Sequence, residues 1–296
     1  YLQQLSASGR YSGVVLVARD GRPVFERAYG QAVLGWRRPN TTSTRFEIAS
    51  LTKQFTATAI LQLAEAGKLA LNDRVSEYYV QAPAAWSQIT ILQLVQHTSG
   101  LPSNGLADFT RGIAVPYTMD ELIATFRDRP LVHTPGAAWA YTNTEYYLLA
   151  YIIEKASGQT YNDYLREHIF RPAGMSDSGY ASTLAVVPNA AEGYARDGTG
   201  LRHRDYFDRS LEAGAGGIYA TATDLLKWNL ALDTGRLINE QSNRLMFTPD
   251  ALGGYGFGWF IEGEPRLRQY HEGSDPGFAA FEARYPGDGL LVIVLA

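Results

Sequence analysis

A serine and a lysine three residues apart, Ser50 and Lys53, are the first residues of the sequence whose types and spacing suggest chemistry. Apolar residues recur every four positions from residue 51 to residue 63, which predicts a helix that ends at Gly67. Side chains three apart share one face of a helix, so Lys53 can reach Ser50 and hold or accept its proton. The start of a helix also favours negative charge on the serine. The alternative is a helix-capping serine followed by a solvated lysine, and the pair alone does not decide between them.

Tyr141 and Asn143 form the only Tyr-x-Asn motif of the chain, just before a helix predicted to start at Glu145. A tyrosine hydroxyl beside an ammonium group can act as a general base, and an asparagine amide can orient a substrate carbonyl. A buried tyrosine followed by a helix-capping asparagine would give the same motif. Taken alone, the motif favours this structural interpretation.

The third group is the run His271, Glu272, Gly273 and Ser274, which holds the only His-x-Gly of the sequence. It lies at the end of a predicted strand, where a glycine allows another group to approach the backbone closely. The alternative is a histidine that simply ends a strand near a turn, so this run is also weak by itself.

Composition excludes several other kinds of chemistry. None of the 296 residues is cysteine, which rules out disulfides, thiolate metal sites and cysteine nucleophiles. The sequence has no Gly-x-Ser-x-Gly and no His-Glu-x-x-His motif. A net charge of −4 without any basic run argues against a nucleic-acid partner. The longest apolar run, residues 290–296, has the length of a strand and is too short to cross a membrane.

The elements that must position these residues are strands at both ends of the chain and helices between them. Two apolar runs around Asp20 and Gly21 predict a hairpin over residues 11–29. We expect helices at residues 89–96, 119–126, 145–155, 161–169 and 223–232, and strands at 256–262, 268–271, 278–285 and 290–296. The predicted fold class is α+β, an antiparallel sheet flanked by helices and built from both termini. Residues 1–70 and 205–296 would form this sheet domain, and residues 71–204 an inserted all-helical domain.

The three motifs occur in the order Ser-x-x-Lys, Tyr-x-Asn, His-x-Gly. With this order of motifs, the sequence resembles the class C β-lactamase and penicillin-binding-protein family of serine hydrolases. Residues 94–102 and the glycine-rich stretch 213–228 are similar to the family as well. The resemblance covers nearly the whole chain, from the hairpin to the last strand. Several segments in the right order are far more specific than any one motif.

The resemblance implies a site between the sheet domain and the helical domain. It implies Ser50 as the acylated nucleophile, Lys53 as its activating partner, and Tyr141 as general base and later general acid. Asn143 would hold a substrate carbonyl, and the backbone N–H groups of Ser50 and Ser274 would form the oxyanion hole. A serine acyl transfer of this kind requires no cofactor and no metal.

Two residues of the third motif depart from the family pattern. His271 stands where many members have lysine, and Glu272 where members that bind a free carboxylate usually have threonine or serine. Facing the site, Glu272 would repel a carboxylate and attract an amine or tolerate a neutral ester. We therefore count His271, Glu272, Gly273 and Ser274 with Asn143 as substrate-binding residues. The alternative is that Glu272 turns away from the site and pairs with an arginine.

The sequence thus predicts a hydrolase that forms an acyl-enzyme on Ser50 and cleaves an ester or a D-amino-acid-containing peptide. A β-lactamase or a DD-carboxypeptidase of the penicillin-binding type is the second interpretation, and a non-catalytic binder of cell-wall peptides is the third. The partner would be a small molecule or a peptide, and the location the periplasm or the exterior, by analogy with the family. The chain starts abruptly at Tyr1 and stops inside its last apolar run, where the family usually continues into a helix, so we expect that both ends were trimmed. The oligomeric state is left open.

Overall fold

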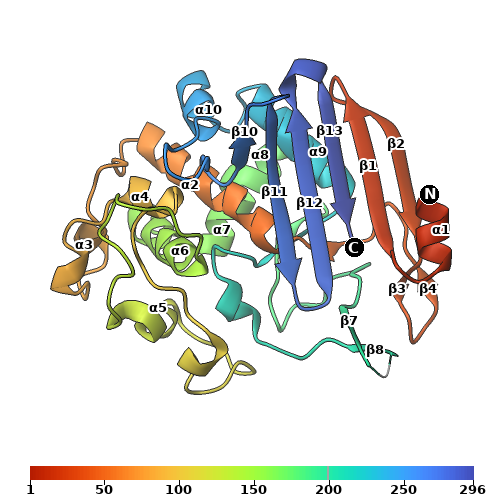
Figure 1. Ribbon diagram of the computed structural model, residues 1–296, viewed down its shortest axis with the longest axis horizontal. Helices are drawn as coiled ribbons and strands as arrows, with labels where there is room; N and C mark the ends of the chain where they lie inside the picture. The colour runs from red at the N-terminus through yellow and green to blue at the C-terminus, as the bar shows by residue number, and fades with distance from the viewer. Residues whose placement is uncertain (199) are drawn as a thin grey trace.

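The computed structural model describes residues 1–198 and 200–296, and strands from both ends of the chain meet in one six-stranded antiparallel sheet (Figure 1). The strand order is β10-β11-β12-β13-β1-β2. The N-terminal part contributes β1 (Gly13–Arg19) and β2 (Arg22–Tyr29); the C-terminal part contributes β10 (Phe260–Glu262), β11 (Arg268–Asp275), β12 (Phe278–Tyr285) and β13 (Leu290–Leu295). The predicted α+β class and the joining of the two termini are therefore what the structure shows.

Local sequence explains how the two ends are joined. Asp20 and Gly21 both have positive φ, 49° and 73°, as a two-residue hairpin turn between β1 and β2 requires. β13 alternates buried and half-buried residues, and its buried side chains Leu291 and Ile293 lie on the face that packs against α9 (Ala222–Asp233). The alternation fixes the register of β13 against β1, because a slip of one residue would expose this apolar face.

Helix α2 (Thr52–Glu65) is the central helix of the fold, buried along most of its length and packed against α6 (Asn143–Ser157). Phe55 of α2 stacks on Trp228 of α9, with ring centroids 4.1 Å apart. At the start of α6, the Thr142 hydroxyl accepts a hydrogen bond from the Thr144 N–H. Since α2 begins directly after Ser50 and α6 begins at Asn143, the contact between the two helices brings these residues together.

The remaining elements are short. The other helices are α1 (Leu2–Ala7), α3 (Val75–Tyr78), α4 (Ile91–Val95), α5 (Met119–Arg127), α7 (Tyr161–Leu165), α8 (Arg171–Ala173) and α10 (Glu240–Met246). Single turns are η1 (Ala49–Leu51), η2 (Ala84–Trp86), η3 (Leu106–Asp108), η4 (Arg166–Phe170), η5 (Arg209–Glu212) and η6 (Pro286–Asp288). The small strands are β3 (Gln31–Val33), β4 (Arg38–Pro39), β5 (Phe46–Glu47), β6 (Gly179–Tyr180), β7 (Tyr194–Asp197), β8 (Gly200–His203) and β9 (Ile218–Ala220).

Two predicted elements differ from the structure. The strand predicted at 256–262 begins only at Phe260. Gly258 has a φ of 82°, which is not a strand conformation, and a Cβ atom there would lie 2.6 Å from Cα of Gln54 in α2. The helix predicted at 161–169 is α7 followed by the π-helical turn η4 and then α8. The other helices and strands lie where they are predicted, with limits that shift by a few residues.

The region between the two parts of the sheet domain is helical only as far as Ala173. Residues 179–203 contain the strands β6, β7 and β8, and β6 pairs with β9 of the predicted sheet domain. The description of residues 71–204 as all-helical is thus wrong for this stretch, while the domain limits themselves stay a prediction. Among the described residues, no helix is both long and apolar enough to cross a membrane.

Candidate active site

Ser50 lies in the single turn η1, between β5 and the start of α2. Ala49 just before it has a φ of 46°, a left-handed conformation that costs a non-glycine residue about 1 kcal/mol. The first hydrogen bond of the turn runs from the Leu51 N–H to the Ile48 carbonyl. The Ser50 N–H comes before it in the chain and is therefore not used within the turn. The sharp turn thus presents the half-buried Ser50 hydroxyl and its own N–H group together.

Lys53 points from the first turn of α2 back to Ser50, as the spacing of the two residues predicts. Its side chain is fully buried, and its Nζ donates to Ser50 Oγ at 3.2 Å, Asn143 Oδ1 at 2.8 Å and the Ala215 carbonyl at 3.0 Å. Burial lowers the pKa of Lys53 to about 7, and the negative charges of Glu212 and Glu145 oppose this shift. An amine with this pKa can accept a proton from serine near neutral pH.

Tyr141 lies over the same lysine, with its ring centroid 4.9 Å from Lys53 Nζ. Burial raises the pKa of the Tyr141 hydroxyl above its ordinary value, and a contact with Ser50 acts in the opposite direction. By strict geometry, however, the buried hydroxyl has no hydrogen-bond partner in the part of the chain described here. We therefore take the two hydroxyls as neighbours that are not yet bonded, with Tyr141 resting as the neutral phenol.

Strand β11 runs along the other side of Ser50, and the ladder shows which way its backbone groups face. Ala279 and Ala296 exchange two backbone hydrogen bonds, so the alternate residues Ala280 and Glu282 face β11. Their partners are Gly273 and His271. The N–H of the intervening Ser274 must then point away from β12, toward the edge where β10 has ended and η1 packs.

Gly273 is the residue that lets this edge approach the nucleophile. A Cβ atom at Gly273 would lie 2.3 Å from the carbonyl oxygen of Ile48, two residues before Ser50. No side chain fits at that distance, so only a glycine allows β11 to pass this close to the segment that leads into Ser50. That the N–H groups of Ser50 and Ser274 form an oxyanion hole stays a prediction.

His271 is buried, with both ring nitrogens engaged. Nδ1 lies 2.6 Å from the Glu272 carbonyl, which can only accept, so Nδ1 carries the proton. Nε2 lies 3.0 Å from the hydroxyl of the buried Tyr255 and accepts from it. Burial, followed by the charge of Lys53, lowers the pKa of His271 to about 3, so the ring is neutral. The structure therefore places His271 beneath the site as a support, and a direct role in binding substrate stays a prediction.

Glu272 and Ser274 are exposed on the opposite face of β11 from His271 and Gly273. Glu272 forms no ion pair within the described residues, so the pairing with an arginine that the sequence leaves open is not found there. Its side chain is exposed to solvent. An action of this charge on substrates stays a prediction.

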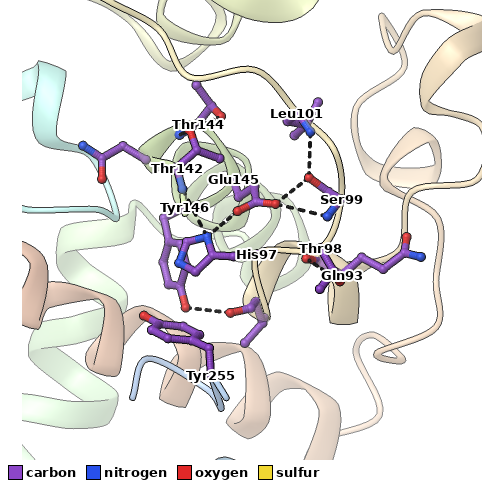
Figure 2. A network of polar contacts seen from close by, with 12 residues as sticks. Gln93, His97, Thr98, Ser99, Leu101, Thr142, Thr144, Glu145, Tyr146 and Tyr255 are labelled. Carbon is purple, nitrogen blue, oxygen red and sulfur yellow. Dashed lines mark hydrogen bonds and ion pairs between the residues drawn. The ribbon is translucent and has the colours of Figure 1, made fainter. Parts of the chain in front are cut away.

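A buried polar network supports the loop that holds Tyr141 (Figure 2). His97 has a φ of 59°, and its ring centroid lies 4.5 Å from that of Tyr141. Its Nδ1 contacts both Glu145 Oε2 and the Thr142 N–H. Glu145 Oε1 accepts from the N–H and the hydroxyl of Ser99, at 3.2 and 2.5 Å. Because the Thr142 N–H donates to Nδ1, that nitrogen has no proton, and the Glu145 carboxyl must supply the one between them.

Electrostatics agree with this neutral pair. Burial lowers the pKa of His97 and raises the pKa of Glu145, each well away from its ordinary value. The contacts of His97 with Glu145 and Thr142 give it a structural role in this network. Glu145 and Tyr255 were missed; the only signal for Glu145 was its place two residues after Asn143. Within the described residues no three His, Cys, Asp or Glu side chains gather in a way that could hold a metal ion.

Comparisons with known proteins agree with this geometry. The family model described as Beta-lactamase matches residues 1–296. The putative penicillin-binding protein PbpX of Bacillus subtilis (strain 168) is 35% identical over 295 residues, which cover 100% of this chain and 71% of that protein. The crystal structure of a penicillin-binding protein from Bacillus halodurans superposes with a TM-score of 0.90 at 30% identity, covering 100% of this chain and 95% of the other. D-amino acid amidase from Ochrobactrum anthropi SV3, complexed with L-phenylalanine amide, has a TM-score of 0.85 at 26% identity, with coverage of 99% and 88%.

Proposed function

The chain belongs to the Beta-lactamase family and is a serine hydrolase of that family, and from this premise we propose that Ser50 is its nucleophile and that its substrates are esters or D-amino-acid amides and peptides. The observation that carries the assignment of Ser50 is its contact with Lys53, a fully buried amine whose pKa lies near 7. A solvated lysine beside a capping serine would have neither the burial nor the three hydrogen-bond acceptors.

The proposed reaction has two steps. Ser50 Oγ attacks the substrate carbonyl while neutral Lys53 takes its proton, and the oxyanion accepts hydrogen bonds from the N–H groups of Ser50 and Ser274. The tetrahedral intermediate then expels the alcohol or amine, which takes a proton from the Tyr141 phenol, and Lys53 returns the proton to Tyr141. Water attacks the acyl-enzyme by the same route in reverse, which releases the acid and restores Ser50.

Asn143 has a double role in this proposal. Its Oδ1 accepts from Lys53, so its NH₂ group is the part left to donate to a carbonyl of the substrate. The same bond fixes the direction in which Lys53 points. A substrate held by Asn143 would therefore be aligned with both the lysine and the serine that it supports.

We further propose that Glu272 disfavours substrates with a free carboxylate. The side chain is exposed and without an ion pair among the described residues, so its charge is not neutralised locally. Neutral esters and D-aminoacyl amides would then be better substrates than penicillins or peptides with a free C-terminus. The names of the relatives support both classes, since they include penicillin-binding proteins and a D-amino acid amidase. We also propose a periplasmic or secreted location.

The experiment measures kcat/KM for a neutral aryl ester, D-phenylalanine amide and a penicillin, with Ser50→Ala and Lys53→Met as controls. We expect turnover of the ester or the amide, slow reaction with the penicillin, and loss of turnover in both variants. Turnover that survives in Ser50→Ala would refute the assignment of the nucleophile. Failure of all three substrates would instead favour a protein that binds cell-wall peptides without cleaving them.

A further inference from the structure

A pocket of about 380 Å³ has Asn143 in its lining. Its apolar lining includes Phe109, Ile113, Phe207 and Leu211. The polar lining includes Asn143 and Glu212. The volume suits a small ligand, such as one aromatic or aliphatic side chain with the atoms around it.

The pocket is joined to the catalytic groups through Lys53. Asn143 in its wall accepts a hydrogen bond from Lys53 Nζ at 2.8 Å, and Lys53 bonds in turn to Ser50. The Glu212 carbonyl accepts from the Ala215 N–H, while the Ala215 carbonyl accepts from Lys53. Two residues of the pocket lining are thus linked by hydrogen bonds to the lysine that contacts Ser50.

All the charged side chains in the described lining of the pocket are acidic. The described lining holds three carboxylates and no lysine, arginine or histidine. Two of the three carboxylates have partners elsewhere: Asp205 pairs with Arg202 at 2.8 Å, and Asp275 pairs with Arg209 at 2.8 Å. The Glu212 carboxylate has neither a hydrogen bond nor an ion pair among the residues that the structure describes.

Nearby charges do not neutralise Glu212 either. Arg204 and Arg209 are shared between Glu47 and Asp275, so these four groups balance one another. Burial, followed by repulsion from Asp275, raises the pKa of Glu212 to about 7, with Lys53 and Arg209 opposing the shift. Among the described residues, however, no cation lies within salt-bridge distance of the Glu212 carboxylate.

The Glu212 carboxylate also lies against the glycine-rich stretch. One of its carboxylate oxygens lies so close to Gly216 that a Cβ atom there would be 1.8 Å away. The Glu212 carbonyl accepts from the Gly216 N–H at 2.9 Å. The glycine-rich stretch therefore serves the placement of this carboxylate as well as the binding of Lys53.

We propose that Glu212 binds the ammonium group of an acyl donor whose apolar side chain occupies this pocket, so that the enzyme prefers esters or amides of amino acids with a free α-amino group. This inference rests on the proposed function of Ser50. The ammonium supplies the cation that the pocket lacks, and Asn143 is placed to donate to the carbonyl group. The rival interpretation is that Glu212 serves only as a distant counter-ion of Lys53 and acts on all substrates alike.

The test compares two methyl esters that differ only in the amino group, those of phenylalanine (both enantiomers) and of 3-phenylpropanoic acid. The measured quantity is kcat/KM for the phenylalanine ester divided by kcat/KM for the 3-phenylpropanoate ester. Each rate is obtained by quantifying the released acid. In Glu212→Gln, this ratio should fall about tenfold or more, because a charge-assisted hydrogen bond to the ammonium is lost. Any effect of Glu212 on Lys53 changes both esters equally and cancels in the ratio.

Two further variants sharpen the comparison. Glu240→Gln on α10 removes the same charge from an exposed residue that pairs with Arg244, and it should leave the ratio unchanged. Glu272→Gln should change the ratio less than Glu212→Gln does. A native ratio near one, a change below about twofold in Glu212→Gln, or an equal effect of Glu272→Gln would overturn the proposal. Hydrolysis of the ester without an amino group shows that the proposed function holds even if the inference fails; hydrolysis of neither ester refutes both.

Discussion

Replacing Glu145 tests whether the buried pair with His97 is neutral. In Glu145→Gln, the side-chain NH₂ can donate to His97 Nδ1 and the amide oxygen can accept from Ser99, so every contact of a protonated carboxyl is kept. We expect the free energy of unfolding to fall by no more than about 1 kcal/mol. Were the pair ionic, the same change would leave a buried imidazolium uncompensated and would cost about 3–5 kcal/mol.

Glu145→Ala is the matched control, because it removes the same contacts without replacement. The Ser99 N–H loses its acceptor, the Ser99 hydroxyl loses one of its two partners, and His97 Nδ1 keeps only the 3.4 Å contact with Thr142. Since these groups are buried, we expect a loss of about 2–5 kcal/mol. Urea denaturation of the three proteins, followed by tryptophan fluorescence, gives the differences.

The dependence on pH provides a second readout of the same pair. The pKa of Glu145 is raised in the folded state, so its contribution to stability is complete below the unfolded value and is lost as the pH rises. Glutamine does not titrate. The stability of Glu145→Gln relative to the native protein should therefore improve as the pH rises above about 4.5. A large loss in Glu145→Gln that grows with pH would refute the neutral pair.

Three other predictions concern the nucleophile and its surroundings. Since the pKa of Lys53 is lowered to about 7 and its neutral form is the base, kcat/KM for an ester should rise with pH up to about 7 and then level; a flat profile from pH 5 to 9 would contradict this. Gly273→Ala places a Cβ atom 2.3 Å from the Ile48 carbonyl and should lower kcat about 100-fold by moving the Ser274 N–H, whereas Gly263→Ala, with open space around it, should not. Glu272→Thr should speed acylation by a penicillin; an unchanged rate would show that its charge does not act on the site.

The sequence was sufficient for the parts of the fold that rest on local patterns. The four-residue period after Ser50, the hairpin at Gly21 and the apolar run after Gly289 each predict an element that the structure contains. The pairing of β1 with β13 followed from the need to complete one sheet from strands at both ends. Short strands such as β6 escaped, because two residues show no period and their pairing depends on tertiary contacts.

Some residues of the candidate site could be predicted from local motifs, and others could not. Ser50, Lys53 and Asn143 were found because their motifs place them at the starts of helices that meet in space. Glu212 and Tyr255 could not be found, since each acts through a contact between segments far apart in the chain. The depressed pKa of Lys53 is likewise a consequence of burial, which no spacing of residues reveals.

The most direct test of the central claim is the intact mass of the protein after reaction with a neutral fluorophosphonate, which phosphonylates an activated serine and has no carboxylate to be repelled. We predict one adduct per chain, located by peptide mapping on the peptide that contains Ser50, and no adduct in Ser50→Ala. An adduct that persists in Ser50→Ala, or a native protein that stays unlabelled while it hydrolyses esters, would contradict the assignment of Ser50 as the nucleophile.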